Sequence, residues 1–380
     1  MDARAGESPA FLRLAPEPVL PAPIFAAGPL AWLRANLFSG WLSSALTLLT
    51  AALCLWLIPP LIAWATVDAV WSAPDGALCR AHQDGACWAF IAHKIDYFRY
   101  GSYPQAERWR VDATEIVGAV LIVWLLWPRA PRRGLGVGLF FAAFPILAFV
   151  LLRGAAPLGL PIVDTVLWGG IFVSLLTALV GIVFSLPLGV LLALGRRSRL
   201  PAVRLASVIY IEFVRGVPFI TVLFMANFML PLFLPEGWAP DRLLRPLVGT
   251  ALFAAAYMAE EVRGGLQSIA KGQFEGAMAL GLSYWRMMGL VILPQALTLV
   301  IPGVVNNFIG LFKDTTLVSI VGLLDFLATV ENAFKDTVWI GPTIAPTGYA
   351  FAALFYFVFC FAMSRYQALM ERRLGRGRRR

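Results

Sequence analysis

Long apolar stretches alternate with short polar segments along this sequence from residue 41 onward. A helix rises about 1.5 Å per residue, so roughly 20 mostly apolar residues cross the hydrocarbon core of a bilayer. On that criterion the pattern predicts eight membrane-spanning helices, near residues 41–66, 113–127, 135–152, 167–193, 206–233, 246–262, 294–312 and 346–365. The second stretch is short, and the seventh is interrupted by Pro302, Gly303, Asn306 and Asn307.

The polar segments between these stretches carry charges that predict an orientation. Cytoplasmic loops of membrane proteins carry an excess of arginine and lysine. With the N-terminus in the cytoplasm, the inside segments are 128–134, 195–204, 263–293 and 367–380, and each carries basic residues. The outside segments are 67–112, 153–166, 234–245 and 313–345, which hold similar numbers of acids and bases. The eight spans therefore predict an all-α polytopic membrane protein with both termini in the cytoplasm.

The composition agrees with this class of protein. Of the 380 residues, 59% are hydrophobic and only 14% are charged, which is typical of membrane proteins. The net charge is +9, but the arginines lie in short loops and at the chain end, so we interpret them as topology signals and expect no nucleic-acid binding. Residues 1–40 are rich in Ala and Pro and predict a disordered cytoplasmic tail without a cleavable signal peptide.

The first outside segment concentrates cysteine and histidine. Cys79, His82, Cys87 and His93 have the types of metal ligands, but their spacing matches no standard zinc site. An outside location makes a disulfide between Cys79 and Cys87 the simpler account, with unpaired structural residues as the alternative. We therefore assign no metal site. The segment 67–112 is long enough to fold by itself.

The stretch EGAMALGLSYWRMMGLVILPQAL (275–297) is too polar and glycine-rich to cross a bilayer. Written as one helix, it has an apolar stripe made of Phe274, Met278, Gly281, Trp285 and Met288. Such a helix can lie along the membrane surface, and Pro294 is expected to end it. The simpler alternative is a surface helix that only connects two spans.

The same stretch resembles the EAA loop of the permeases of ABC importers. The resemblance lies in Glu275-Gly276-Ala277, then three residues, Gly281, then nine residues and VILP ending at Pro294. In that family the loop is a coupling helix that docks in a cleft of a cytoplasmic ATPase. The resemblance therefore implies that Glu275, Gly276, Ala277 and Gly281 couple this chain to an ATPase. For Glu275 the alternative is a charge that only stabilises the helix dipole.

The resemblance extends over roughly residues 165–370. AAYMAEEVRGGLQSIAKGQ, NNFIGLFKDTTLVSIVG and YIEFVRGVPFI are similar to the permease subunits of polar amino-acid importers. The first outside segment, with GACWAFI and YPQAERWRV, resembles a narrower group, the general L-amino-acid permeases with three extra N-terminal spans. The implied organisation is a tail over 1–40, an accessory transmembrane region over 41–166 with a periplasmic loop over 67–112, a five-helix type I core over 167–366 and a basic cytoplasmic tail over 367–380.

This resemblance also implies partners. They are a second permease subunit, two cytoplasmic ABC ATPase subunits, a periplasmic amino-acid-binding protein and an L-amino acid as substrate, in a bacterial inner membrane. The sequence contains no phosphate-binding loop of the form G-x-x-x-x-G-K-[ST]. We therefore expect this chain to be no enzyme and to bind no cofactor, with ATP and Mg²⁺ used by the ATPase.

A path for substrate is predicted in the seventh span. Asn306 and Asn307 lie beside the Pro-Gly pair at membrane depth, where polar side chains usually face a cavity or another helix. Broken helices near the midplane often build substrate sites, but these asparagines could instead only join helices. Lys313 and Asp314 are candidates for the outer mouth, with a solvated helix cap as the alternative.

Two further pairs of charges are expected near the inner surface. Glu212 with Arg215, and Glu260 with Arg263, have the three-residue spacing of intrahelical ion pairs. Two rival functions remain open on the sequence. A membrane-embedded enzyme needs acid pairs or histidines inside a span, and both histidines lie outside. A stand-alone ion-coupled secondary transporter needs repeated halves, and no repeat is visible.

Overall fold

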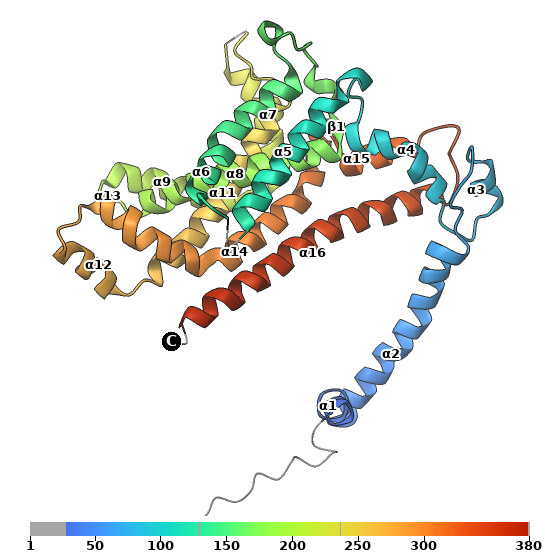
Figure 1. Cartoon of the computed structure of the whole chain (residues 1–380), viewed down its shortest axis with the longest axis horizontal. Helices are drawn as coiled ribbons and strands as arrows, with labels where there is room; N and C mark the ends of the chain where they lie inside the picture. Colours follow the sequence, from blue (N-terminus) through green and yellow to red (C-terminus); the bar gives the residue numbers. More distant parts are fainter. Residues whose placement is uncertain (1–27, 128–129, 236, 379–380) are drawn as a thin grey trace, which may run out of the picture. The chain divides into compact units, whose positions relative to one another are not determined.

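The structure, a computed structural model, describes residues 28–127, 130–235 and 237–378, with side chains described as far as residue 373. The predicted all-α class is confirmed, since helices dominate and the strands of the described part are two residues long. The chain divides into two compact units, Met1–Val67 and Asp68–Arg380. Each is described by itself (Figure 1).

The first unit holds one short and one long helix. Helix α1 (Pro29–Asn36) has its proline in the first turn, where the missing N–H is not needed. A disordered tail was predicted as far as residue 40, so that prediction is wrong for α1, and residues 1–27 lie outside the described part. Helix α2 (Trp41–Ile62) continues into the π-helical turn η1 (Ala63–Val67) and coincides with the first predicted span.

The second unit begins with the segment predicted as accessory. Its elements are α3 (Ala77–Ala81), α4 (Trp88–Tyr100), η2 (Gln105–Glu107), α5 (Arg108–Leu126), α6 (Arg133–Gly138), η3 (Leu139–Ala143), α7 (Phe144–Arg153), η4 (Ala156–Leu158) and η5 (Thr165–Leu167). The compact unit runs on from these helices into the predicted core without a boundary at residue 166. The structure therefore separates 68–166 from the first span and not from the core.

The remaining elements form the predicted core. They are β1 (Gly169–Gly170), α8 (Ile171–Arg196), α9 (Pro201–Gly216), α10 (Phe219–Phe224), η6 (Met225–Met229), η7 (Leu230–Phe233), α11 (Leu244–Gln267), α12 (Lys271–Ala279), α13 (Tyr284–Met287), η8 (Met288–Ile292), α14 (Leu293–Asp314), η9 (Thr315–Val321), β2 (Leu324–Asp325), α15 (Phe326–Ala333) and α16 (Ile344–Arg378). Helix α16 continues through the residues predicted as a basic tail.

Five described helices are long and apolar enough to cross a membrane, or six if a bent pair is one span. The five are Trp41–Val67, Arg133–Arg153, Ile171–Arg196, Tyr284–Val321 and Ile344–Arg373. The predicted spans 113–127 and 246–262 also form helices, α5 and α11, but neither is among the five. Both carry charged side chains within the helix, which lowers their apolarity.

The fifth predicted span is not one helix. Helix α9 and the segment Phe219–Phe233 are bent by 110° at a short break. The break lies at Val217, whose backbone is extended (φ −104°, ψ 136°). Val217 precedes Pro218, and a proline disfavours the helical conformation in the residue before it. The span predicted over 206–233 is therefore a pair of helices joined by a bend, which counts as one span only if the bend lies within it.

The seventh predicted span is longer and more regular than expected. One helix runs from Tyr284 to Val321, so neither Pro294 nor the Pro302–Gly303 pair breaks it. Pro294 lies in the first turn of α14, directly after the π-helical turn η8. A local π-helical turn lets the neighbouring backbone groups form the hydrogen bonds that a proline cannot make, so the helix continues past Pro294. Both the predicted stop at Pro294 and the predicted interruption are wrong.

Glycines allow the core helices to approach closely. A Cβ at Gly189 of α8 would lie 2.6 Å from the Cβ of Met258 on α11, and one at Gly181 would lie 2.6 Å from Leu311 of α14. Likewise, a Cβ at Gly265 of α11 would lie 2.7 Å from the Ala296 carbonyl oxygen. Small residues at helix contacts are typical of membrane bundles. Helices α8, α11 and α14 therefore form one closely packed group.

Strands β1 and β2 pair in parallel at the edge of this group, with Gly170 opposite Asp325. The Asp325 side chain is fully buried and accepts hydrogen bonds from the backbone N–H groups of Leu327 (3.0 Å) and Ala328 (3.2 Å), which caps α15. Burial raises the pKa of Asp325 to about 7, because desolvation of the carboxylate outweighs these two donors.

The outer segment, residues 68–107 of the predicted first outside loop, packs on the core. A disulfide joins Cys79 and Cys87, whose Cα atoms are 5.8 Å apart. The Cys87 N–H donates to the Thr347 hydroxyl of α16 (2.9 Å), and Arg80 donates to the Val338 carbonyl oxygen (3.1 Å). Buried residues of this segment share one apolar cluster with α15 and α16. The segment predicted to be long enough to fold by itself therefore packs on the core.

Candidate functional site

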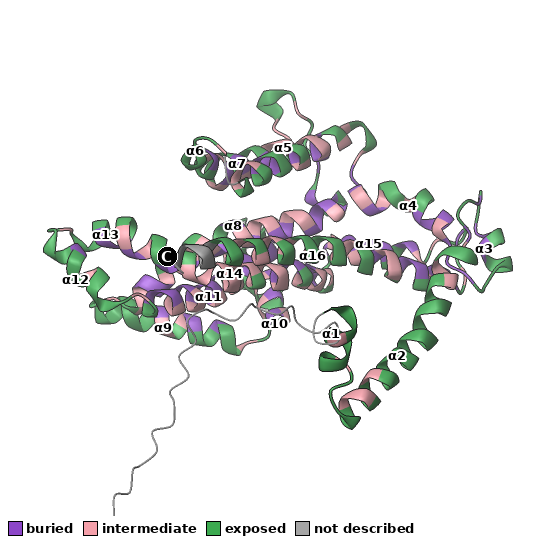
Figure 2. Ribbon diagram, turned by 60° about the horizontal axis from the view of Figure 1, so that its bottom comes forward, coloured by how far each residue is buried: buried purple, intermediate pink, exposed green. Residues whose placement is uncertain are grey.

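Helices α12 and α13 lie with α9 at one end of the second unit, and α3, α4 and α15 lie at the other end (Figures 1 and 2). On α12, Glu275 and Gly276 are exposed, whereas Ala277 is 4% exposed and belongs to a buried cluster with residues of α8 and α11. Of these three predicted coupling residues, Glu275 and Gly276 are therefore exposed, and Ala277 packs against the core. This arrangement suits a segment that contacts a partner and passes a displacement to the core.

The turn between α12 and α13 depends on Gly281. Its φ is +74°, the left-handed conformation that glycine adopts without steric cost. The Gly281 N–H donates to the Met278 carbonyl oxygen (2.9 Å), and the Leu282 N–H donates to the Ala277 carbonyl oxygen (3.2 Å). These two bonds form a Schellman motif, which ends a helix. The prediction of one continuous helix over 275–290 is therefore wrong.

This turn also divides the predicted apolar stripe. Met278 is 57% exposed and Trp285 is 69% exposed, whereas Met288 is buried among core residues. Leu280, beside the turn, is 81% exposed. The α12–α13 segment therefore offers a surface with both charged and apolar character.

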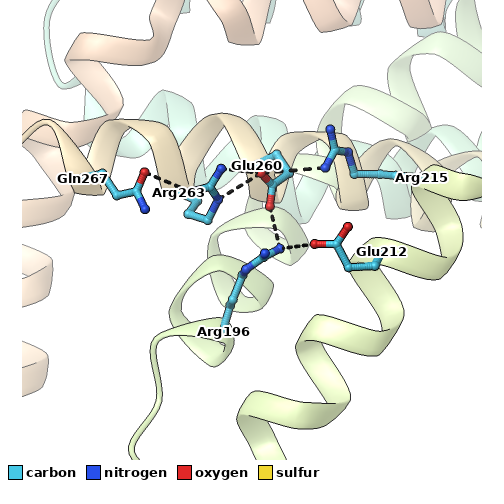
Figure 3. A network of polar contacts seen from close by, with 6 residues as sticks. All are labelled: Arg196, Glu212, Arg215, Glu260, Arg263 and Gln267. Atoms are coloured by element: carbon cyan, nitrogen blue, oxygen red, sulfur yellow. Dashed lines mark hydrogen bonds and ion pairs between the residues drawn. The ribbon is translucent and has the colours of Figure 1, made fainter.

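A network of charges joins three helices next to this segment (Figure 3). Arg196, at the end of α8, lies 2.8 Å from carboxylate oxygens of both Glu212 on α9 and Glu260 on α11. The predicted Glu260–Arg263 pair is present at 2.7 Å. Arg215 lies 3.7 Å from Glu260, and Glu212 is paired with Arg196. The predicted Glu212–Arg215 pair is therefore wrong.

Glu260 is the centre of this network. Its side chain is 15% exposed, and Arg263 donates to the same carboxylate oxygen from Nε (2.9 Å) and Nη2 (2.7 Å). Charge-assisted hydrogen bonds of this kind are stronger than neutral ones. The sequence did not predict the ion pairs of Arg196. Its partners lie 16 and 64 residues away, and spacing along a sequence indicates only pairs within one helix. The network fixes the end of α8 against α9 and α11.

The predicted substrate-path residues lie along two stripes of α14. Asn306 and Lys313 are exposed and seven residues apart, and Asn307 and Asp314 are half-buried with the same spacing. Residues seven apart lie on the same side of a helix. The second pair faces inward, and the Nδ2 atom of Asn307 is buried without a hydrogen-bond partner in the described part of the chain.

Glu261 lies close to the inward stripe, and sequence reasoning did not select it. A Cβ at Gly303 would lie 2.1 Å from the Glu261 Oε2 atom, so the carboxylate lies directly against the α14 backbone. Gly303 is four residues before Asn307 and therefore one turn away on the same side of α14. The signal that could have identified Glu261 is a second acid beside Glu260 in an otherwise apolar helix.

Comparison with known proteins relates the chain to transport proteins. Residues 185–376 match the family model described as binding-protein-dependent transport system inner membrane component. The inner membrane amino-acid ABC transporter permease protein YhdY of Escherichia coli (strain K12) is 48% identical over 95% of this chain and 97% of its own length. The glutamate/glutamine/aspartate/asparagine transport system permease protein BztC of Rhodobacter capsulatus is 40% identical over 94% of this chain and 96% of its own length.

A similar solved structure is described as the crystal structure of an amino acid ABC transporter with histidines. It is 28% identical, covers 54% of this chain and 92% of the matched chain, and gives a TM-score of 0.47.

Proposed function

Because this chain belongs to the family of binding-protein-dependent transport system inner membrane components, we propose that it is the permease subunit of an ABC importer for L-amino acids. The names of YhdY and BztC support amino acids as the substrate class. The observation that carries the coupling role is the exposed α12–α13 segment, anchored to the core through Ala277 and turned at Gly281.

The remaining parts of the transporter are separate chains. They are a second permease, homologous or identical, two cytoplasmic ABC ATPases and a periplasmic amino-acid-binding protein. ATP and Mg²⁺ act in the ATPases, since this sequence contains no phosphate-binding loop, and the chain itself binds no cofactor. Both termini face the cytoplasm, which puts α12 and α13 on the side of the ATPases.

The α12–α13 segment transmits the work of ATP binding. Closure of the ATPases displaces α12 through its exposed Glu275 and Gly276. The displacement reaches the bundle by two routes, through buried Ala277 and through the continuous helix that begins at Tyr284. The bundle then changes which side of the membrane is open, and the substrate shifts that balance only by binding the two states with different affinity.

The substrate path follows the inward side of α14. Asn307 supplies a buried amide without a partner among the described residues, and Asp314 supplies a carboxyl on the same stripe. Asn306 and Lys313 lie on the exposed stripe, where a second permease would complete the path. An amino acid carries an ammonium and a carboxylate, and these polar groups can receive both.

The test is uptake of a labelled L-amino acid into proteoliposomes. The vesicles hold the purified complex of this chain with its second permease and ATPases, with the binding protein outside. Uptake should require ATP inside and the binding protein outside. In the Gly281→Asp variant, association with the ATPase or its stimulation should fall sharply. Uptake by this chain alone, driven by an ion gradient, would instead support a secondary transporter and overturn the proposal.

A further inference from the structure

A groove with a volume of about 880 Å³ lies between the α8–α9 loop and the α12–α13 segment. Its apolar walls include Leu191, Val203, Phe274, Met278 and Trp285. Residues 274 and 278 are four apart and share one side of α12, whereas positions 275 and 276 point to other sides. The proposed contact with an ATPase therefore uses a different face of α12 and leaves the groove unassigned.

Both walls of the groove are ends of apolar helices. Leu191 belongs to the span Ile171–Arg196, and Trp285 belongs to the first turn of the span Tyr284–Val321. The Tyr284 and Trp285 rings pack edge to face at 5.3 Å, and both side chains are exposed. Tyrosine and tryptophan are enriched where a membrane meets water. Leu191 lies five residues before the end of the 26-residue span Ile171–Arg196, whose length about matches a bilayer with its headgroup regions, so we place the groove at the level of the lipid headgroups.

Two arginines give the groove a positive rim. Arg197 and Arg199 line it, and its lining includes no aspartate or glutamate in the described part of the chain. The Arg197 guanidinium donates to the Leu266 carbonyl oxygen (3.3 Å) and lies 5.6 Å from the Phe274 ring centroid. These contacts hold Arg197 beside the groove and leave most of its five N–H donors for a ligand. Guanidinium groups match the geometry of phosphate oxygens.

We propose that this groove binds an anionic phospholipid. The phosphate lies on Arg197 and Arg199, and an acyl chain lies against Val203, Phe274 and Met278. Basic pockets between membrane helices bind anionic headgroups in this way, and the volume lies within the roughly 300–1,000 Å³ typical of ligand sites. The assignment to the inner leaflet rests on the proposed function, which places α12 on the cytoplasmic side.

A lipid in this position contacts the α8–α9 loop and α12 together. The α8–α9 loop begins directly after Arg196, which is held by the Glu260 network. The lipid therefore connects that fixed point to the segment that meets the ATPase. Anionic lipid should accordingly favour one arrangement of α12 relative to the bundle.

The test is photolabelling of the full complex in nanodiscs. The probes are phosphatidylglycerol and phosphatidylethanolamine with the same photoreactive acyl chain, and labelled peptides are located by mass spectrometry. Phosphatidylglycerol should label peptides that include residues 191–203 and 274–288 more strongly than phosphatidylethanolamine. Arg197→Gln and Arg199→Gln should each lower this labelling by about tenfold, the effect of losing one charge-assisted hydrogen bond. Inorganic phosphate should not compete.

Two further variants separate lipid binding from misfolding. Arg204→Gln removes an exposed arginine that does not line the groove and should leave labelling unchanged. Val203→Trp fills the groove without changing its charge and should lower labelling. Equal labelling by the two lipids, competition by inorganic phosphate, no response to Arg197→Gln and Arg199→Gln, or loss of labelling when the ATPase binds would each overturn the proposal. ATP-dependent uptake is scored separately, so the permease function can hold while lipid binding fails.

Discussion

The guanidinium of Arg196 and the carboxylate of Glu260 meet at 2.8 Å and join the end of α8 to α11 (Figure 3). Glu260 is also paired with Arg263 on its own helix and lies near Arg215 on α9. One mostly buried carboxylate thus lies within ion-pair distance of arginines from three helices. Because the loop after Arg196 lines the groove beside α12, this carboxylate fixes the surroundings of the α12–α13 segment.

Replacing Glu260 should destabilise the protein more than replacing Glu212. Glu260→Gln leaves three arginines without their shared anion, and the free energy of unfolding should fall by about 3 kcal/mol. Glu212→Gln is the matched control, because the Glu212 side chain is 55% exposed and an exposed pair contributes at most about 1 kcal/mol. Denaturation midpoints of the purified variants measure both, and equal losses would contradict a central role for Glu260.

Two glycines of the α12–α13 segment, Gly276 and Gly281, allow the effect of backbone conformation on stability to be measured without side-chain clashes. At both Gly276 and Gly281 a Cβ would meet no atom within 4 Å. Gly281→Ala should cost about 1–2 kcal/mol, because an L-residue is strained at φ +74°. Gly276→Ala lies in a helix and should stabilise it by up to about 1 kcal/mol.

The same two variants test coupling. Stimulation of the ATPase should fall in Gly281→Ala and persist in Gly276→Ala, measured as phosphate release by the assembled complex. Loss of stimulation in both would show that the contact at Gly276 does not tolerate even a methyl group, and persistence in both would contradict a role for the turn at Gly281.

Stability should depend on pH through Asp325. Its pKa in the folded protein is raised to about 7, against about 3.9 for an exposed aspartate. Between these values the folded state binds the proton more tightly than the unfolded state. The contribution of Asp325 to the free energy of unfolding therefore falls as pH rises from about 4 to about 7. Asp325→Asn keeps a good helix cap and does not ionise. Its denaturation midpoint should therefore fall less than that of the natural protein over this range, and an identical pH dependence would contradict the assignment.

The disulfide should stabilise the outer segment. Cys79 and Cys87 are separated by 8 positions in the sequence. Replacing both by Ser should lower the free energy of unfolding by about 2.5 kcal/mol, because the unfolded chain gains entropy when this loop is no longer closed. Limited proteolysis should then cut faster in the segment 68–107 and in residues 334–347, which this segment contacts. Cys54→Ser and Cys360→Ser are controls, since neither cysteine is in a disulfide. Unchanged proteolysis in the double variant would show that packing alone holds this segment.

Apolar patterning was sufficient to predict the helical class and the approximate positions of the five long apolar helices of the described part. Patterning was not sufficient to predict where the helices turn or end. Gly281 was placed on a helical stripe, although a glycine followed by Leu282 also fits a Schellman cap, and only the observed φ decides between them. Pro294 and Pro302 were interpreted as breaks, but membrane helices tolerate proline where a π-helical turn or neighbouring helices supply the missing backbone contacts.

The candidate site also contains residues that the sequence predicted and residues that it did not. The EAA-like spacing placed Glu275, Gly276 and Ala277 on one helix over 275–290, and the structure keeps the three together on the shorter helix α12. Arg196 and Glu261 were missed, because their contacts are with residues on other helices. Such contacts depend on how helices pack, which the pattern of a single chain does not specify.

The central claim is that the α12–α13 segment faces the cytoplasm and contacts an ATPase. In a background with Cys54 and Cys360 replaced by Ser, Glu275→Cys tests the segment, and Leu158→Cys, in a predicted outside segment, is the control. A membrane-impermeant maleimide should label Leu158→Cys in intact spheroplasts and Glu275→Cys only after permeabilisation. In the assembled complex, Glu275→Cys should cross-link to the ATPase with a yield that changes when ATP is added. Labelling of Glu275→Cys from outside, or no cross-link to the ATPase with or without ATP, would contradict the account.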